Sequence, residues 1–425
     1  DTAQFQRLRG IKQLGTASLV FPGAVHTRFE HSIGVLHMVE QFVAAANRNA
    51  ARSPSDCRRV DDAERRLIRI AALVHDVTHI PFGHNIEDQT GLLPRHDVAD
   101  RYRAAFGDTE IGAVLERLGV RDAVLDVLGA GGTDLPAFCR QMLSDTIDAD
   151  LLDYLRRDAH YTGLELRYDD RVREYFRIDR GSERMFVDCA KQGMLREDIV
   201  SELTRVLEIR YHFSERVYYH HAKIAAGALL ARMVELALRG GALTAEALQS
   251  STDESLLGQL ERAQLDSAAD TERLGRYVER FRRRALPKRV LVLPFYLNEA
   301  VQQELLDTWF RPGAPEARLA WEAEREAEAR SRFGHDVDIT MYCPARRMQL
   351  KEARTLVRIP GESGRIVELA DIADDVPRLR DLQASYPRLW KLYVFASAAD
   401  RDERRELQRM CLDALPGGSV NALLL

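Results

Sequence analysis

The spacing of apolar residues over the first two thirds of the chain constrains the fold more than any other feature of the sequence. Between residues 1 and 286 they recur at intervals of three and four, the period of a helix with one buried face. The clearest helix follows Asp61, which can cap its first turn with Glu64 three residues later, and it delivers His75 and Asp76 at its C-terminal end. We therefore expect a mainly α fold, with an all-α core over residues 1–286.

The sequence changes character after residue 286. Four short segments there are rich in β-branched and aromatic residues, and the last three alternate in polarity as strands do: 289–297, 336–343, 353–359 and 389–396. Residues 316–333 predict a charged, exposed connector helix, because their acids at least match their bases. We expect a smaller C-terminal α+β lobe over residues 287–425.

Length and composition exclude several classes of protein. A chain of 425 residues is long enough for one large domain and a smaller one. A net charge of −5 gives no general attraction to nucleic acid or to membranes, and no uncharged apolar stretch is long enough to predict a membrane span. Five single cysteines without a C-x-x-C pair favour reduced thiols in a cytoplasmic protein.

Histidine is concentrated in the segment "LVHDVTHIPFGHNIED" and its surroundings, since seven of the twelve histidines lie between residues 26 and 96. His75 and Asp76 are adjacent and can reach one ion beyond the end of a helix. Neighbouring helices offer His31 and Asp150 to complete the ligand set. Two imidazoles and two carboxylates suit one divalent metal, for which Mn, Fe, Mg, Zn and Ni are not distinguished. A remaining position would hold water, whose pKa the cation lowers.

The order H…HD…D is typical of the HD phosphohydrolases. Around it, four segments resemble the deoxynucleoside triphosphate triphosphohydrolases, both the bacterial dGTPase type and the animal SAM-and-HD-domain enzyme: "FQRLRGIKQLG", "FPGAVHTRFEHSIGV", "HDVTHIPFGHNIE" and "DADLLDYLRRD". "DITMYCPARRMQLK" and "LWKLYVFA" resemble the small C-terminal lobe of the animal enzyme. The resemblance implies metal ligation by His31, His75, Asp76 and Asp150. It also implies attack of water on the α-phosphorus of a dNTP, which releases the deoxynucleoside and inorganic triphosphate.

The resemblance further implies four residues that handle the triphosphate and the proton transfers: His79, His84, Glu87 and His96. His79 follows His75 by four residues and so faces the same cleft. A turn presents His84 with Glu87 three residues beyond it, and a histidine oriented by a carboxylate is an acid or base unit. Animal members carry aspartate at the Glu87 position, so this chain matches the bacterial pattern G-H-x-x-E.

Substrate contacts are expected from a wider set of residues: Gln13, Leu14, Arg28, Asp150, Tyr154, Asp158, Arg210, Tyr218 and His220. The resemblance supports Arg28 and Arg210 as phosphate clamps, whereas Lys223 is added on charge alone. Asp150, Tyr154 and Asp158 are four residues apart and project from one stripe of a helix. An aromatic ring packed against deoxyribose would leave no room for a 2′-hydroxyl. His26, His37, His212 and His335 are expected to be structural.

Nucleotide activation is the point at which this chain departs from the animal enzyme. Four residues match its activator sites: Asp1, Gln6, Arg9 and Arg196. Asp198 and Glu202 replace a lysine and an asparagine at the second site, and two acids would repel a triphosphate there. We therefore do not expect dNTP activation at that site, although GTP-like binding at the first remains open. Leu151 also replaces a lysine beside the last metal aspartate. The family suggests a homo-oligomer, dimer or tetramer.

Two other functions compete with the dNTPase. An HD-type nuclease or phosphodiesterase acting on single-stranded nucleic acid would use the same metal in an open groove with basic and aromatic residues, and the nearly balanced charge disfavours it. A nucleotide-sensing scaffold with little catalysis is disfavoured by the four intact metal-ligand candidates. A bacterial dNTPase would serve nucleotide-pool balance or antiviral defence against phage.

Overall fold

Helices dominate the computed structural model, which describes residues 1–87, 93–132, 134–311, 315–343, 353–361, 365–398 and 400–425. The mainly α class is confirmed. The helices of the N-terminal part are α1 Ala3–Arg7, α2 Arg28–Arg52, α3 Asp62–Val74, α4 His84–Glu87, α5 Ala99–Ala105, α6 Glu110–Arg117, α7 Arg121–Val127, α8 Ala137–Gln141 and α9 Ala149–Thr162. They are followed by α10 Glu197–Phe213, α11 His221–Arg239, α12 Ala245–Ser250, α13 Asp253–Arg262 and α14 Ala268–Arg282.

Two capping boxes fix where α2 and α3 begin. At α2 the side chain of Thr27 accepts from the backbone of Glu30, whose carboxylate accepts from the backbone of Thr27. Asp61 and Glu64 form the same arrangement at α3, as the sequence predicted. Because α2 begins at a defined residue, His31 lies one turn inside the helix, on its buried side.

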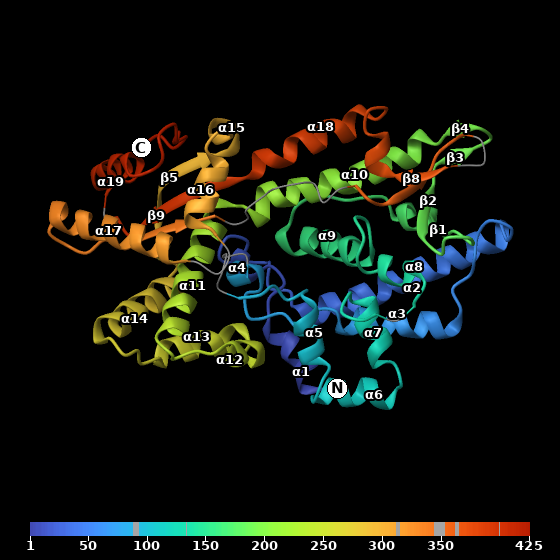
Figure 1. Cartoon of the computed structure of the whole chain (residues 1–425), viewed down its shortest axis with the longest axis horizontal. Helices are drawn as coiled ribbons and strands as arrows, with labels where there is room; N and C mark the ends of the chain where they lie inside the picture. Colours follow the sequence, from blue (N-terminus) through green and yellow to red (C-terminus); the bar gives the residue numbers. More distant parts are fainter. Residues whose placement is uncertain (88–92, 133, 312–314, 344–352, 362–364, 399) are drawn as a thin grey trace.

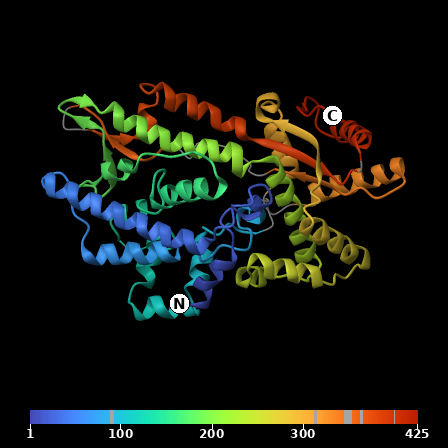
Figure 2. The same ribbon diagram turned by 180° about the vertical axis from the view of Figure 1, so that it is seen from behind.

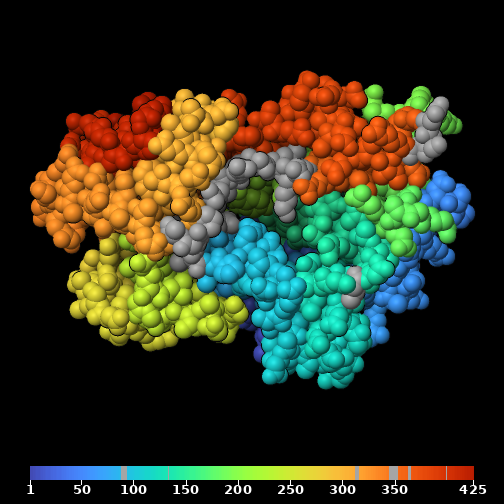
Figure 3. Space-filling view, in the orientation of Figure 1, coloured from blue at the N-terminus to red at the C-terminus, as the bar shows by residue number. Residues whose placement is uncertain are grey.

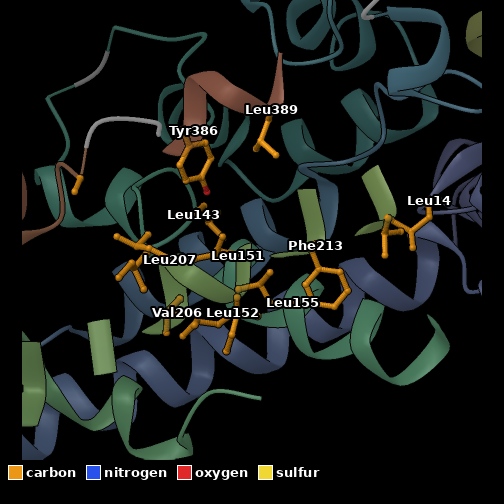
Figure 4. Close-up of a cluster of buried hydrophobic side chains, with 14 of the residues drawn as sticks. Leu14, Leu143, Leu151, Leu152, Leu155, Val206, Leu207, Phe213, Tyr386 and Leu389 are labelled. Atoms are coloured by element: carbon orange, nitrogen blue, oxygen red, sulfur yellow. The ribbon is translucent and has the colours of Figure 1, made fainter. Parts of the chain in front are cut away.

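Helix α9 is held between α2 and α10, which places its acidic stripe beside the histidines of α2 and α3. Asp148 caps its first turn and Gly163 ends it in the left-handed conformation, with φ of 73°. Figure 4 shows the apolar side of α9, with Leu151 and Leu155, packed against Phe213 of α10. Burial of this side therefore sets the direction in which the opposite side of α9 points.

Short strands within residues 176–195 contradict the all-α expectation for residues 1–286. They are β1 Phe176–Ile178, β2 Met185–Asp188, β3 Ala190–Lys191 and β4 Met194–Leu195. β2 pairs in parallel with β7 (Leu356–Arg358), with Val187 opposite Val357, in a sheet of order β1-β2-β7-β8, where β8 is Ile366–Glu368. Strands of two to four residues carry no readable period. β2 gains a partner distant in sequence in β7, whereas β1 pairs with β2, and β3 and β4 pair with each other.

The C-terminal part combines strands with helices, as the sequence predicted. Its remaining strands are β5 Lys288–Pro294, β6 Ile339–Tyr342, β8 Ile366–Glu368 and β9 Lys391–Ala396, and its helices are α15 Phe295–Asn298, α16 Gln302–Trp309, α17 Glu316–Phe333, α18 Pro377–Ser385 and α19 Arg401–Asp413. β5, β9 and β6 form an antiparallel sheet in that order (Figure 2). The three segments predicted as strands are confirmed by β6, β7 and β9. Residues 344–351 of the resembling segment lie outside the described residues.

The boundary proposed at residue 286 stays a prediction. One hydrophobic core contains residues from both sides of it, including Phe42 of α2, Leu291 of β5 and Trp390 next to β9. None of the helices within the described ranges combines the length and the apolar composition needed to cross a bilayer.

Helix α17 was expected to be an exposed connector, and this expectation is wrong. Arg318 and Glu322 are 2% and 0% exposed. Arg318 donates to Glu322 at 3.0 Å and to Glu235 of α11 at 2.5 Å, and Arg232 of α11 pairs with Glu235 at 3.0 Å. The charge pattern concealed this role because the acids and bases neutralise one another across two helices rather than in water.

Truncating Arg318 should therefore destabilise the protein strongly. Arg318→Ala leaves two buried carboxylates to share one arginine, and the free energy of unfolding should fall by about 3 kcal/mol. Arg330→Ala on the exposed side of α17, where the side chain is 68% accessible, should change it by less than about 0.5 kcal/mol. Denaturant titration of both variants measures the difference, and equal stabilities would contradict the assignment.

Candidate active site

The structure brings together the four residues predicted to bind a metal. His31 lies on α2, His75 and Asp76 follow the end of α3, and Asp150 lies in the first turn of α9. Nε2 of His31 is 2.8 Å from Oδ1 of Asp150 and 4.0 Å from Oδ2 of Asp76. Nε2 of His75 is 3.5 Å from Oδ1 of Asp76 and 3.8 Å from Oδ1 of Asp150. Three helices separated in sequence thus supply one compact donor set.

Contacts behind these residues orient both imidazoles. Nδ1 of His31 donates to Asp153 at 2.8 Å, and Arg157 holds the same carboxylate through two hydrogen bonds of 2.9 and 2.8 Å. Nδ1 of His75 donates to the carbonyl oxygen of Ala72 at 2.7 Å. The Nε2 atoms are thereby left for the site. Gly34 permits this packing, because a Cβ there would lie 1.9 Å from Oδ1 of Asp153.

The donor set fits a divalent cation. Nε2 of His75 is buried and has no hydrogen-bond partner within the described protein, which is the state of a ligand atom rather than of a satisfied core histidine. Burial alone would raise the pKa of Asp76, but Arg28, His75 and His79 hold it well below its usual range. Burial opposes charge on His31 as well, yet hydrogen bonds to Asp150 and Asp153 raise its pKa to about 10. The site therefore attracts positive charge, and a cation would compete with that proton.

We expect Asp153 to control metal affinity although it lies behind the ligands. Asp153→Asn replaces the carboxylate that fixes the ring of His31, and the affinity for Mn²⁺ should fall by about 10- to 100-fold. Isothermal titration with Mn²⁺ tests this. Asp100→Asn on α5, where the side chain is 92% exposed, is the matched control. Equal affinities in the two variants would show that Asp153 has no part in binding.

The four residues predicted to handle phosphate and protons lie directly beside the metal-ligand set. His79 connects the two groups, because its Nε2 is 3.2 Å from Oδ1 of Asp76. The rings of His79 and His96 are stacked with centroids 3.5 Å apart, and the ring of His84 approaches both edge-on at 5.3 and 5.1 Å. Burial lowers the pKa of His79 well below its usual value and also lowers that of His96.

The sequence paired Glu87 with His84, and the structure corrects this. Among the described residues, Glu87 accepts hydrogen bonds from Nδ1 of His96 at 2.8 Å and from Arg101 at 3.1 Å. The left-handed conformations of Phe82 and Gly83, with φ of 55° and 43°, turn the chain between His79 and α4. This turn sends Glu87 toward α5, so that the carboxylate orients His96 instead.

His79, His84 and His96 offer ligand atoms within 4.8 Å of one another, as His31, His75 and Asp76 do. The two groups differ in geometry, because the His79 and His96 rings are inclined by only 21°. The in-plane lone pairs of stacked, nearly parallel rings do not converge on one ion. The three imidazoles therefore suit hydrogen bonds to an anion better than metal ligation.

The residues predicted to bind the nucleoside are also partly assembled. The hydroxyl of Tyr218, at the end of a π-helical turn over Ser214–Tyr218, donates to Oδ2 of Asp158 at 2.7 Å. Gln13 lies next to the buried Leu14, and its Oε1 is buried without a partner in the described protein. His220 caps α11, where its Nδ1 accepts from Ala222 at 3.3 Å.

The predicted phosphate clamps differ in how they are held. Arg28 is 3% exposed and donates to Oδ2 of Asp76 at 2.8 Å. Burial lowers the pKa of Arg210, but Tyr154, Tyr386 and Asp148 outweigh burial and keep the guanidinium charged. The ammonium group of Lys223 donates to the carbonyl oxygen of Tyr218 at 3.1 Å, so it stabilises the π-helical turn. Figure 3 shows a hollow in the middle of one face, with cyan and teal segments below it and orange segments above it.

The positions compared with activator sites fall into two clusters. Gln6 donates to Asp1 at 3.5 Å and accepts from Arg9 at 2.7 Å, and the guanidinium of Arg9 lies 3.5 Å from the centre of the Phe29 ring. Asp1, Gln6 and Arg9 therefore share one part of the surface. Arg196 instead forms two hydrogen bonds to Asp198, at 2.9 and 2.6 Å.

Several residues that shape the site were missed by sequence reasoning. Asp153 could have been found, because it follows Asp150 by three residues on the same helix. Arg7 donates to the carbonyl oxygens of Val77 and His79 at 2.8 Å and so braces the turn after Asp76. Nothing in the local sequence points to Arg7, since its partners lie about 70 residues away.

Comparison with known proteins identifies the family. The HD domain model matches residues 28–158, and the model of the HD associated region matches residues 189–415. An uncharacterized Bacillus subtilis protein is 34% identical over 56% of the chain and 50% of its own length. An uncharacterized Methanocaldococcus jannaschii protein is 26% identical over 96% of the chain and 76% of its own length.

Human deoxynucleoside triphosphate triphosphohydrolase SAMHD1 is 28% identical over 52% of the chain, which spans 38% of the human protein. A crystal structure of a hypothetical protein from Aquifex aeolicus has the same fold, with a TM-score of 0.65 at 22% identity over 96% of this chain and 93% of that one. The chain therefore belongs to the HD-domain family that carries the HD associated region, a family of metal-dependent phosphohydrolases that includes deoxynucleoside triphosphate triphosphohydrolases.

Proposed function

We propose that this protein hydrolyses deoxynucleoside triphosphates to the deoxynucleoside and inorganic triphosphate. One observation carries the proposal. Asp76 belongs to the metal-ligand set, and its Oδ1 also lies 3.2 Å from Nε2 of His79, a member of the imidazole cluster formed by His79, His84 and His96. A cation site and a group of buried imidazoles are thus in direct contact. Attack of water on a phosphorus atom needs cationic groups around the phosphates and a proton for the leaving oxygen.

His31, His75, Asp76 and Asp150 would hold the metal. A divalent cation there supplies positive charge at the phosphate and lowers the pKa of a neighbouring water. Arg28 adds a permanent charge at the same place, because its guanidinium is bonded to Asp76 and buried. Arg210 contributes a second guanidinium from α10. Arg28 is positioned by its hydrogen bond to Asp76 before substrate binds, which limits the reorganisation that catalysis requires.

The members of the imidazole cluster would have two roles, phosphate binding and proton donation. Burial lowers the pKa values of His79 and His96, and the N–H of each neutral ring is directed at Asp76 or Glu87, so either ring would donate a hydrogen bond to phosphate oxygen only in its protonated form. A bound phosphate would favour that form. His84 is exposed, unlike His79, and a general acid needs solvent access to regain its proton. We therefore assign His84 as the donor of the proton to the leaving oxygen, with Glu87 and Arg101 as supports for His96.

Selectivity for deoxyribose would come from the Tyr218 side of the site. The ring of Tyr218 is held at its hydroxyl by Asp158, and it also stacks on Phe213 with centroids 5.9 Å apart. A ring fixed at both its face and its hydroxyl cannot move away from a 2′-hydroxyl. A ribonucleotide would therefore be excluded by contact rather than by the loss of a hydrogen bond.

The proposal also covers activation of the enzyme by nucleotides and its assembly into an oligomer. The shared surface of Asp1, Gln6 and Arg9 supports a guanine-nucleotide activator site. Arg196 is already paired with Asp198, which supports the absence of dNTP activation at the second site. A homo-oligomer, dimer or tetramer, is carried over from the family.

Product analysis separates the proposed function from its alternatives. The protein is incubated with each dNTP, each NTP and a labelled single-stranded oligonucleotide in Mn²⁺ or Mg²⁺. Inorganic triphosphate released from dNTPs but not from NTPs supports the proposal. A shortened oligonucleotide with no triphosphate would replace it with a nuclease, and nucleotide binding without turnover would indicate a sensing scaffold.

A further inference from the structure

His26 was expected to be structural, yet it forms a buried hydrogen-bonded triad with two residues of the nucleoside side. Nε2 of His26 donates to Oδ1 of Asp158 at 2.9 Å, and the hydroxyl of Tyr218 donates to Oδ2 of the same carboxylate at 2.7 Å. His26 and Asp158 are each 1% exposed. Both oxygens of the carboxylate are therefore held by side chains from different segments.

The ring of His26 is itself fixed in place. It stacks on Tyr161 with centroids 4.5 Å apart and planes inclined by 18°, and the hydroxyl of Tyr161 donates to Glu30 at 3.1 Å. The carbonyl oxygen of His26 accepts from the backbone N–H of Gln13 at 2.9 Å. His26 thus connects the segment of Gln13, the start of α2 and the end of α9.

Two polar atoms in this region lack partners. Nδ1 of His26 and Oε1 of Gln13 are buried, and neither has a hydrogen-bond partner in the described protein. An unsatisfied buried polar atom costs about 1–3 kcal/mol, so such atoms are rare in a region that only packs. Such atoms occur elsewhere in the described protein as well, but here the two lie on paired segments beside Asp158 and Tyr218, which supports a ligand group at this place. Both atoms are acceptors, because the proton of His26 is on Nε2, so each requires a hydrogen-bond donor such as a ligand hydroxyl.

We propose that His26 is a positioning residue for sugar recognition, which holds Asp158 and through it Tyr218 in the arrangement that selects deoxyribose. This inference rests on the proposed dNTPase function. If His26 is removed, Oδ1 of Asp158 loses its buried hydrogen-bond donor. The carboxylate is then free to rotate toward a different donor. The hydroxyl of Tyr218 then loses its anchor, and the ring no longer excludes a 2′-hydroxyl.

The test compares KM and kcat for a dNTP and the matching NTP, measured by triphosphate release, in three variants. His26→Ala should raise KM for the dNTP about tenfold, with kcat within about twofold, and should lower the preference for dNTP over NTP about tenfold. His26→Gln keeps a donor near the position of Nε2 and should restore most of the preference. His37→Ala, an exposed histidine on α2, should behave as wild type.

Tyr218→Phe keeps the test decisive if His26→Ala does not fold. It removes the anchoring hydroxyl without opening a cavity, and it should lower the same preference about tenfold. A folded His26→Ala variant or a Tyr218→Phe variant that retains the wild-type preference for dNTP over NTP would overturn the inference about His26 but not the proposed function. A wild-type protein that releases no triphosphate from any dNTP would instead overturn the proposed function.

Discussion

Replacing His75 by alanine should lower triphosphate release by about 10⁴-fold or more while leaving the helical fold in place. His75 follows the last residue of α3, and its Nε2 has no partner within the described protein, so its loss removes a metal ligand without breaking a structural hydrogen bond at that atom. The hydrogen bond from its Nδ1 to Ala72 lies at the helix end, where solvent can replace it.

Three measurements check this expectation. Circular dichroism should give wild-type helix content, metal analysis should give much less bound metal, and the assay should give almost no triphosphate. His37→Ala is the matched control, since it removes an exposed histidine from α2. A His75→Ala protein with full activity would refute the metal-binding role, and a variant that unfolds would show that the residue is mainly structural.

Replacing His84 by alanine should lower kcat by about 10²- to 10³-fold but leave metal binding unchanged, which distinguishes His84 from His75. The physical reason is that an alkoxide is a poor leaving group, so the transition state depends on a proton supplied to the departing oxygen. His84 is the exposed member of the imidazole cluster, whereas His79 is buried and shares a contact with Asp76.

The choice of leaving group tests the role of His84 directly. A nitrophenyl triphosphate releases a phenolate that needs no proton, so the loss caused by His84→Ala should shrink to less than about tenfold on this substrate. Isothermal titration with Mn²⁺ should give the same affinity as wild type. Equal losses on both substrates would assign His84 to phosphate binding rather than to proton transfer.

Much of the site was predictable because its determinants are local. The capping pair of Asp61 and Glu64 defines the start of α3 and therefore the position of His75 and Asp76. The buried side of α2 places His31 among core residues such as Val35 and Phe42, which are both 0% exposed. In each case a period of three to four residues determines which side chains face inward.

The features that were missed depend on partners distant in sequence. β2 pairs with β1 nearby, but its other edge is completed by β7, about 170 residues away. Arg318 of α17 is buried because Glu235 of α11 lies opposite. Glu87 orients His96 rather than His84, because the direction of α4 is set by the left-handed turn before it. No local pattern encodes the contacts of β2 with β7 or of Arg318 with Glu235, whereas the Glu87–His96 hydrogen bond joins residues only nine positions apart.

The proposed function depends on one cation bound by His31, His75, Asp76 and Asp150. Anomalous X-ray diffraction from crystals grown with Mn²⁺ tests it most directly, because it locates the metal independently of any assay. We predict one peak bound by Nε2 of both histidines and by both carboxylates, at about 2.0–2.2 Å from each. A peak on His79, His84 and His96 instead, or no peak between the four residues, would contradict the account.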